Sequence, residues 1–245
     1  MARPDSRTDV FGHALEDAVD GRPDSIVLER DDGYVDNFPS SVLLQPLSEW
    51  PPIERWLLRS VRPPVLDLGC GAGRVALVLQ DRGIRVLAVD QSPRAVRVAR
   101  RRGVREARVM DLFDLRLPRN RFRTVLLYGN NFGMFGTPLR MRRILHQLYG
   151  LTTEGARIIG TGIDPYRTDE PAHRRYHARN RHEGRMPGEV RLRARYHSYR
   201  GPWFRLLWLS PNELSRLVKG TGFRVLKIRK SRGPQYAVIL GRQPS

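Results

Sequence analysis

A short glycine-rich turn after an apolar run is the feature that most limits how this chain can fold. The run Val65-Leu66-Asp67-Leu68 is followed by Gly69, Gly71 and Gly73, and a segment with helical spacing comes next. This order predicts a buried strand, a tight turn and a helix N-terminus, because glycine accepts positive φ and lets backbone approach a ligand closely. The free N–H groups at the start of a helix favour a polar or anionic ligand group. The turn therefore predicts a nucleotide-like cofactor at the carboxyl end of a first strand.

The spacing of these glycines, and the acid before them, narrow the kind of nucleotide. The glycines follow G-x-G-x-G, whereas a dinucleotide fingerprint reads G-x-G-x-x-G. The chain has no G-x-x-x-x-G-K-[ST] run, which disfavours a nucleoside triphosphatase. A carboxylate at Asp67 would repel a pyrophosphate and attract a cation. We therefore expect a cofactor that presents positive charge to this turn.

Further acids follow the next predicted strands. Asp90 ends an apolar run roughly 20 residues after the glycine turn, where a carboxylate can accept hydrogen bonds from ribose hydroxyls. Ser92 and Pro93 then predict the N-cap and first residue of a helix. Residues 108–112 predict a third strand and its exit, and residues 123–128 predict a fourth strand that leads into Gly129-Asn130-Asn131-Phe132-Gly133.

Taken together, these motifs resemble those of class I S-adenosylmethionine-dependent methyltransferases over roughly residues 60–160. The resemblance implies that Asp67 lies near the amino acid part of the cofactor and that Asp90 binds its ribose. It also implies that Asp111 binds the adenine amino group, with Asp114 in the same loop as an alternative, and that the loop at 129–133 faces cofactor and acceptor. The expected cofactor is S-adenosyl-L-methionine, with the following expected contacts: Asp67, Gly69, Gly71, Gly73, Asp90, Gln91, Asp111, Leu112 and Asn130.

The alternation of strand-like and helix-like segments predicts an α/β fold. We expect a doubly wound, mostly parallel seven-stranded sheet of the Rossmann-like methyltransferase type, whose last strand the resemblance implies to be antiparallel. The expected strands are 64–68, 85–89, 107–110, 123–128, 156–161, 223–229 and 235–240, and the expected helices are 73–82, 92–102, 138–149 and 211–219.

Two segments stand outside this alternation. Residues 1–45 predict an N-terminal flap or a partly disordered segment with a short helix near 11–19, and a turn at 31–34 leads into an extended stretch at 35–44. The methyltransferase domain is expected at 46–245, with its first helix between 48 and 61. Residues 162–209 predict an inserted loop, short helix and β-hairpin after the fifth strand, with the reversal at Gly201-Pro202.

Methyl transfer from a sulfonium is an in-line displacement that depends on alignment and exclusion of water. A general base is needed only if the acceptor must lose a proton. Our candidates for catalytic groups are Tyr128, after the fourth strand, and His173 and His177 in the insertion. The loop after Tyr128 is not the [DN]-P-P-[YF] form of many base-amine methyltransferases, which argues against that acceptor. Asn130 and Asn131 would alternatively supply only turn geometry.

The inserted helix offers a possible lining for an acceptor pocket. His173, Tyr176, His177 and Asn180 follow three- and four-residue steps, which place them on one helical face. One of the histidines would then act as the base, whereas the alternative is a solvated, basic surface helix. The H-x-x-x-H step also fits two metal ligands, but no nearby Asp, Glu or Cys completes a set, so no metal is expected.

The strongly basic composition raises the question of a nucleic-acid partner. The formal net charge is +19, and three of the 44 basic residues are lysines, so the other 41 are arginines. Because the arginines are scattered along the chain, we favour compositional bias over a nucleic-acid footprint.

The single Cys70 fits a reducing cytoplasm and a small buried side chain rather than a nucleophile. No apolar run is long enough to span a bilayer, and Met1–Asp5 lack a signal core.

The sequence therefore predicts a cytoplasmic S-adenosylmethionine-dependent methyltransferase that acts on a small-molecule acceptor. The alternatives are a methyltransferase of RNA or another nucleic acid, and a non-catalytic cofactor-binding protein of the same fold.

Overall fold

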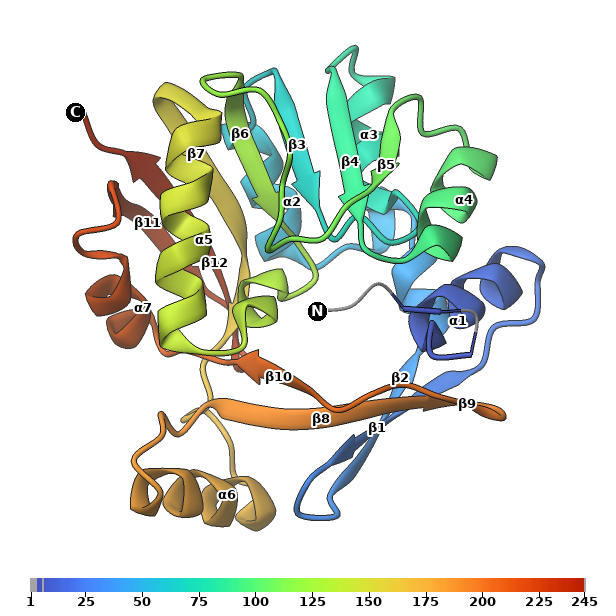
Figure 1. Ribbon diagram of the computed structural model, residues 1–245, viewed down its shortest axis with the longest axis vertical. Coiled ribbons are helices and arrows are strands. Elements are labelled where there is room, and N and C mark those ends of the chain that lie inside the picture. Colours follow the sequence, from blue (N-terminus) through green and yellow to red (C-terminus); the bar gives the residue numbers. More distant parts are fainter. Residues whose placement is uncertain (1–3, 6, 245) are drawn as a thin grey trace. The chain divides into compact units, whose positions relative to one another are not determined.

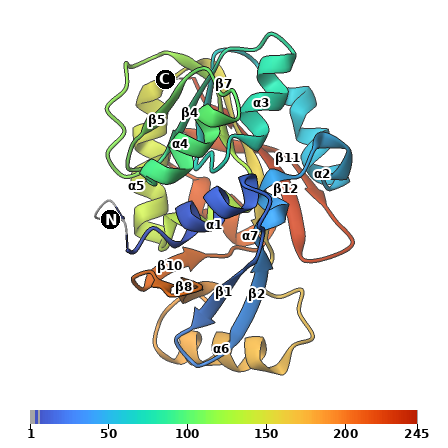
Figure 2. The same cartoon turned by 90° about the vertical axis from the view of Figure 1, so that its right-hand side faces the viewer.

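The computed structural model (Figures 1 and 2) describes residues 4, 5 and 7–244. The chain divides into two compact units. The first unit combines the chain up to Pro51 with Arg62–Pro118 and Leu192–Trp203. The second unit combines Pro52–Val61 with Arg119–Arg191 and the chain from Phe204 onward. Each unit therefore draws its residues from distant parts of the sequence.

The expected α/β fold is confirmed by a seven-stranded, mostly parallel sheet (Figure 1). Its strand order is β11-β12-β7-β6-β3-β4-β5. The strands are β3 (Val65–Leu68), β4 (Val86–Asp90), β5 (Ala107–Val109), β6 (Phe122–Leu127), β7 (Thr152–Ile163), β11 (Phe223–Lys230) and β12 (Gln235–Arg242). Their boundaries lie close to the predicted ones, except that β7 begins four residues earlier than expected.

The first unit contains the parallel strands β3, β4 and β5, of which β3 leads to the glycine turn. All four residues of β3 are buried, and β3 pairs in parallel with β4 from Val65↔Val86 to Leu68↔Val89. The helices α3 (Arg74–Asp81) and α4 (Pro93–Arg101) follow β3 and β4. Ser92 caps α4 and Pro93 is its first residue, as the sequence predicted.

In the second unit, β12 runs antiparallel to β7 and β11. The parallel pair of β6 and β7 ends at Leu127↔Gly160, but β7 continues to Ile163 beside β12. The resemblance implied that the last strand is antiparallel, and β12 confirms this. The helical elements of this unit are α2 (Pro52–Leu57), η3 (Leu58–Ser60), η4 (Asn131–Phe135), α5 (Pro138–Leu151), α6 (Pro171–His182) and α7 (Pro211–Val218).

The described residues of the N-terminal segment form regular structure, whereas the sequence also allowed a partly disordered segment. It forms α1 (Val10–Val19), the antiparallel strands β1 (Ser25–Arg30) and β2 (Val35–Pro39), and the short helical turns η1 (Ser40–Leu44) and η2 (Leu47–Glu49). The extended stretch predicted at 35–44 therefore ends at Pro39, a residue that has no N–H for a strand ladder. Within the first unit, α1 packs against α4 (Figures 1 and 2).

A second, smaller sheet joins this N-terminal hairpin to part of the insertion. Its strand order is β10-β8-β1-β2, where β8 is Glu189–Tyr196 and β10 is Phe204–Leu207, and the short β9 (Tyr199–Arg200) also pairs with β8. The predicted reversal at Gly201-Pro202 is wrong. The chain reverses after Tyr196, which pairs with Tyr199, because His197 adopts a turn conformation with φ +49°.

Among the residues that the structure describes, no helix combines the length and the apolar character that a membrane crossing requires.

Candidate functional site

The glycine turn after β3 has the backbone conformation that the sequence predicts. Gly69, Gly71 and Gly73 all have positive φ, at +70°, +54° and +77°. The N–H groups of Gly69 and Cys70 both donate to the carbonyl oxygen of Val89, at 2.9 and 3.1 Å, which fastens the turn to β4. Gly73 is the N-cap of α3 and supplies no side-chain cap for the helix. The turn therefore presents backbone rather than side chains at the start of α3.

Two of these glycines are needed for different reasons. A Cβ on Gly73 would lie 2.3 Å from Val104 Cγ2, so close helix packing leaves no room for a side chain. A Cβ on Gly71 would meet only Leu15 Cδ1, at 3.9 Å, so the space beside Gly71 is open. The open space is what the backbone needs if a ligand is to pass close to Gly71.

Asp90 is the acid that connects the glycine turn to the end of β4. Its Oδ2 accepts a hydrogen bond from Gly71 N–H and its Oδ1 accepts one from Ser92 N–H, both at 2.9 Å. Burial raises the pKa of Asp90, although these N–H groups act in the opposite direction. Each carboxylate oxygen keeps a further lone pair. Asp90 is thus held in one orientation with capacity to accept hydrogen bonds from a ligand.

Asp67 is buried, with 2% of its surface exposed, and its Oδ2 has no hydrogen-bond partner. Burial, and to a smaller extent the charge of Asp90, raise the pKa of Asp67 to about 7, while Arg74 acts in the opposite direction. An unpartnered buried carboxylate oxygen is costly unless a donor binds it. A ligand ammonium group would supply that donor and a compensating charge, so these residues fit a cofactor with a positively charged amino group.

The remaining expected cofactor residues lie in the loops that follow β4 and β5. Met110 N–H donates to the carbonyl oxygen of Asp90 at 2.9 Å, and Asp111 comes next along the chain. Asp111 Oδ1 accepts a hydrogen bond from Phe113 N–H, also at 2.9 Å. Its alternative, Asp114, is exposed and forms an ion pair with Arg116. Gln91 is exposed and Leu112 is half-buried, and their contacts with a cofactor stay predictions.

The loop after β6 belongs to the second unit. Tyr128 is buried and its hydroxyl donates to the carbonyl oxygen of Glu54 at 3.1 Å, so this group already has a partner in the fold. Asn130 has φ +64°, and its N–H donates to Thr161 Oγ1 at 2.9 Å. The Oδ1 of Asn130 is buried and has no hydrogen-bond partner. Asn130 therefore combines the turn role that we considered with an acceptor atom available to a ligand.

The inserted helix α6 buries most of the face that we identified from its spacing. Tyr176, His177 and Asn180 are buried, whereas Arg174, Arg175 and Arg181 on the other side are exposed. The Tyr176 hydroxyl accepts a hydrogen bond from Arg191 N–H, and the Asn180 amide donates to the carbonyl oxygens of Pro187 and Glu189. These two side chains therefore hold the chain that leads into β8, a structural task that spacing alone does not indicate.

The two histidines of α6 have different surroundings. His173 Nδ1 lies 3.0 Å from Thr168 Oγ1, and the ring of His177 stands edge-on to that of Tyr166, with 6.1 Å between the ring centres. Their catalytic role stays a prediction. Over the described ranges 4–5 and 7–244, no group of three or more His, Cys, Asp or Glu side chains could hold a metal ion.

Sequence reasoning missed the N-terminal helix as a neighbour of the candidate site. Asp9, the N-cap of α1, accepts a hydrogen bond from the Ser92 hydroxyl at 2.7 Å. The signal for the cap itself was present, since Asp9 precedes the helical spacing of residues 11–19. No local pattern could show that this cap contacts a residue 83 positions away.

Comparisons with known proteins show similarity to methyltransferases. Residues 65–155 match the family model described as a methyltransferase domain. A solved methyltransferase from Bacteroides fragilis, in complex with S-adenosyl-L-homocysteine, is 26% identical, with 98% of this chain and 97% of that chain covered and a TM-score of 0.85. A comparison with curated protein sequences gives no match.

Two further solved structures are similar in fold. A methyltransferase from Methanosarcina mazei is 18% identical, with 74% of this chain and 92% of that chain covered and a TM-score of 0.60. The CcbJ methyltransferase from Streptomyces caelestis is 16% identical, with 80% of this chain and 94% of that chain covered and a TM-score of 0.59. Since the Bacteroides fragilis structure covers nearly the whole of both chains, the similarity extends to the N-terminal segment and the insertion.

Proposed function

Since the chain belongs to the class I S-adenosylmethionine-dependent methyltransferases, we propose that it transfers a methyl group from S-adenosylmethionine to a small-molecule acceptor. The observation that carries this proposal is the glycine turn together with its two acids. Gly71 leaves open space beside the backbone, Asp90 is oriented by two N–H groups, and Asp67 has an unpartnered buried oxygen.

Each of these residues has a separate task in holding the cofactor, which supplies a methyl group activated by a sulfonium. The Asp67 carboxylate would bind the ammonium group of the methionine part, because it is buried and lacks a donor. Asp90 would accept hydrogen bonds from the ribose hydroxyls through its remaining lone pairs. Asp111, in the loop after β5, would bind the adenine amino group.

The acceptor side involves the loop after β6 and the insertion. Asn130 Oδ1 is an unpartnered acceptor, and His173 and His177 are the side chains that could remove a proton from an acceptor. Tyr128 is our third candidate, and to act as a base its hydroxyl would have to ionise and give up the hydrogen bond that it donates to the Glu54 carbonyl oxygen. An acceptor that is already a free nucleophile would need none of these bases.

Three observations favour a small molecule over a nucleic acid. The loop after β6 lacks the base-amine motif, and residues 162–209 form an insertion large enough to shape a pocket. Moreover, part of the arginine excess is paired with acids: Arg94 and Arg97 of α4 pair with Glu16 of α1, and Arg101 pairs with Asp20, the C-cap of α1. These arginines do not add to a free basic surface.

The function can be tested in two stages with the full-length chain. Isothermal titration should show S-adenosylhomocysteine binding in the micromolar range, and the absence of binding would reject the cofactor assignment. A donor labelled in its methyl group should then be offered to a small-molecule extract and, separately, to total RNA. Label transfer to the extract alone supports the proposal, whereas transfer to RNA supports the alternative. Binding without transfer to either would favour a non-catalytic protein.

A further inference from the structure

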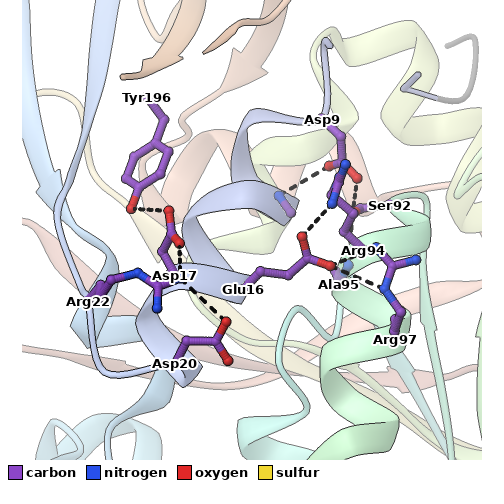
Figure 3. A network of polar contacts seen from close by, with 11 residues as sticks. Asp9, Glu16, Asp17, Asp20, Arg22, Ser92, Arg94, Ala95, Arg97 and Tyr196 are labelled. Carbon is purple, nitrogen blue, oxygen red and sulfur yellow. Dashed lines mark hydrogen bonds and ion pairs between the residues drawn. The ribbon is translucent and has the colours of Figure 1, made fainter. Parts of the chain in front are cut away.

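The N-caps of α1 and α4 are bonded to each other (Figure 3). Ser92 Oγ accepts a hydrogen bond from Ala95 N–H at 2.9 Å and donates its own proton to Asp9 Oδ2 at 2.7 Å. Asp9 Oδ1 accepts from Gly12 N–H at 3.1 Å. Both capping residues are 4% exposed. The hydroxyl of Ser92 has one proton, so its direction is determined by Asp9.

The same serine contacts the acid expected to bind the ribose. Ser92 N–H donates to Asp90 Oδ1, while Gly71 N–H donates to Asp90 Oδ2. A continuous series of hydrogen bonds therefore runs from Asp9 through Ser92 to Asp90. Because a carboxylate turns easily about its own bond, the donor at each oxygen decides where the free lone pairs point.

The helix that carries Asp9 is held firmly on α4 and on the glycine turn. Leu15 packs in one cluster with Ala72, Ala95 and Val98. Glu16 accepts hydrogen bonds from Arg94 and Arg97, as Figure 3 shows. The approach is close at Gly12, where a Cβ would lie 2.6 Å from Arg94 Cβ. These contacts keep Asp9 at a constant place beside Ser92.

The charge of Asp9 is not needed for a cap alone. Asn and Ser cap helices as well as Asp does, and a buried carboxylate bound only by neutral donors is costly. In the described structure the side-chain partners of Asp9 are the Gly12 N–H and the Ser92 hydroxyl, both neutral. What a carboxylate adds is a second acceptor oxygen, which allows Asp9 to cap α1 and bind Ser92 at once.

We propose that Asp9 is a positioning residue of the cofactor site, which through Ser92 holds the Asp90 carboxylate in the orientation that binds the ribose. The inference rests on the proposed function, because it takes Asp90 as the ribose acceptor. It makes the N-terminal helix α1 a part of the cofactor site, although Asp9 itself contacts no reacting atom.

The test compares Asp9→Asn with Asp20→Asn in the full-length chain. An asparagine that accepts from Gly12 N–H through its oxygen places an NH2 donor where Asp9 has Oδ2, so the Ser92 hydroxyl can no longer donate its proton to residue 9. Asp20 lies at the other end of α1, where it pairs with Arg101, and thus controls for a general loosening of the helix. We expect Asp9→Asn to weaken S-adenosylhomocysteine binding about five- to tenfold, less than removal of Asp90 itself, because Asp90 stays in place but loses part of its orientation toward the ribose. Asp20→Asn should change it less than about twofold.

A ribose-specific measurement separates positioning from a structural effect. The probe is the analogue of S-adenosylhomocysteine that lacks the ribose 2′-hydroxyl. If Asp9 acts through Asp90, the variant should bind this analogue almost as well as the wild type does, so the preference for the hydroxyl shrinks. Equal weakening of both ligands, or no weakening of either, would overturn the proposal.

Three further variants cover a folding failure and the dependence on Asp90. If Asp9→Asn does not fold, Ser92→Ala and Ser92→Thr replace it, since threonine keeps the hydroxyl and should restore the preference that alanine loses. If Asp90→Ala weakens binding but Asp9→Asn does not, only the role of Asp9 is rejected. If neither Asp9→Asn nor Asp90→Ala weakens binding, both the role of Asp9 and the assignment of Asp90 to the ribose are rejected.

Discussion

The N–H group of Gly71 donates to Asp90 Oδ2 at 2.9 Å, so the turn after β3 and the acid that ends β4 form one unit. The two residues lie 19 positions apart in the sequence but next to each other at the carboxyl ends of two parallel strands. The hydrogen bond orients the carboxylate for a ligand that passes along the turn. Several measurable consequences depend on it.

Asp90→Ala should weaken S-adenosylhomocysteine binding by about 10- to 100-fold, corresponding to the ~1.5–3 kcal/mol of hydrogen bonds to a charged group. The variant removes the expected ribose acceptor and leaves the N–H groups of Gly71 and Ser92 without their partner. Isothermal titration measures the effect. Asp81→Ala, which removes an exposed acid at the end of α3, is the matched control and should bind like the wild type. Equal affinities for both variants would contradict the assignment of Asp90.

The raised pKa of Asp67 makes the stability of the unliganded protein depend on pH. The pKa is about 7 in the folded protein and 3.8 without the effect of the fold, so the folded state binds more protons between these values. This contribution to stability is therefore present at low pH and is lost as the pH rises from about 4 to 7. Each unit of pKa shift corresponds to roughly 1.4 kcal/mol, so the total is on the order of a few kcal/mol. Asp67→Asn should consequently be more stable than the wild type at pH 8, with the difference nearly gone at pH 4.

Urea unfolding at the two pH values measures this difference, and a gain that is the same at both would contradict the role of the charge. Binding should show the opposite preference, because the ammonium group needs the ionised carboxylate. Wild-type affinity for S-adenosylhomocysteine should rise from pH 6 to pH 8, whereas Asp67→Asn should bind weakly at both. The substitution that stabilises the free protein should thus impair the site.

Gly73→Ala should destabilise the protein much more than Gly71→Ala. At Gly73 the φ of +77° and the contact of 2.3 Å with Val104 Cγ2 together predict a loss of about 2–4 kcal/mol. At Gly71 the φ of +54° predicts a loss of about 1–2 kcal/mol, since nothing lies closer than 3.9 Å. The order should be reversed for S-adenosylhomocysteine binding. Gly71→Ala should bind more weakly than Gly73→Ala, because the methyl group at position 71 enters the space expected for the cofactor. Urea unfolding measures the stability and isothermal titration of the same samples measures the binding. If Gly73→Ala is more stable than Gly71→Ala, the predicted order of stability is wrong.

Asn130→Gly separates the backbone role of this residue from that of its amide. Glycine accepts the φ of +64°, so the free energy of unfolding should change by less than about 1 kcal/mol. Loss of the unpartnered Oδ1 should nevertheless weaken S-adenosylhomocysteine binding about five- to tenfold, if a ligand N–H donates to it. Asn120→Gly is the control, because Asn120 also has positive φ, at +50°, and is exposed. If the two variants bind equally well, Asn130 supplies turn geometry alone.

Most of the fold and half of the candidate site follow from short-range patterns. Strand β3, the turn and α3 occupy consecutive residues, so glycine spacing and burial predict them together. The cap of α4 is equally local, because Ser92 and Pro93 carry it. The prediction of a reversal at Gly201-Pro202 also used a local pattern, as did the correct predictions of the glycine turn and the α4 cap, but here the local pattern was wrong. A glycine-proline pair indicates a turn locally, but pairing of β8 with β9 put the reversal at His197.

The sequence by itself predicted the elements expected to bind the cofactor: strand β3, the glycine turn and the acid that ends β4. The strand and the turn are neighbours along the chain, and β4 pairs directly with β3, so short-range patterns are sufficient to predict them. Only the tertiary structure decided what surrounds them. The pairing of β1 with β8 and the bond between Asp9 and Ser92 join segments separated by 83 or more positions. Such contacts depend on the complementary shapes and charges of whole elements, here the acids of α1 against the arginines of α4, and no local spacing encodes which element will be the partner.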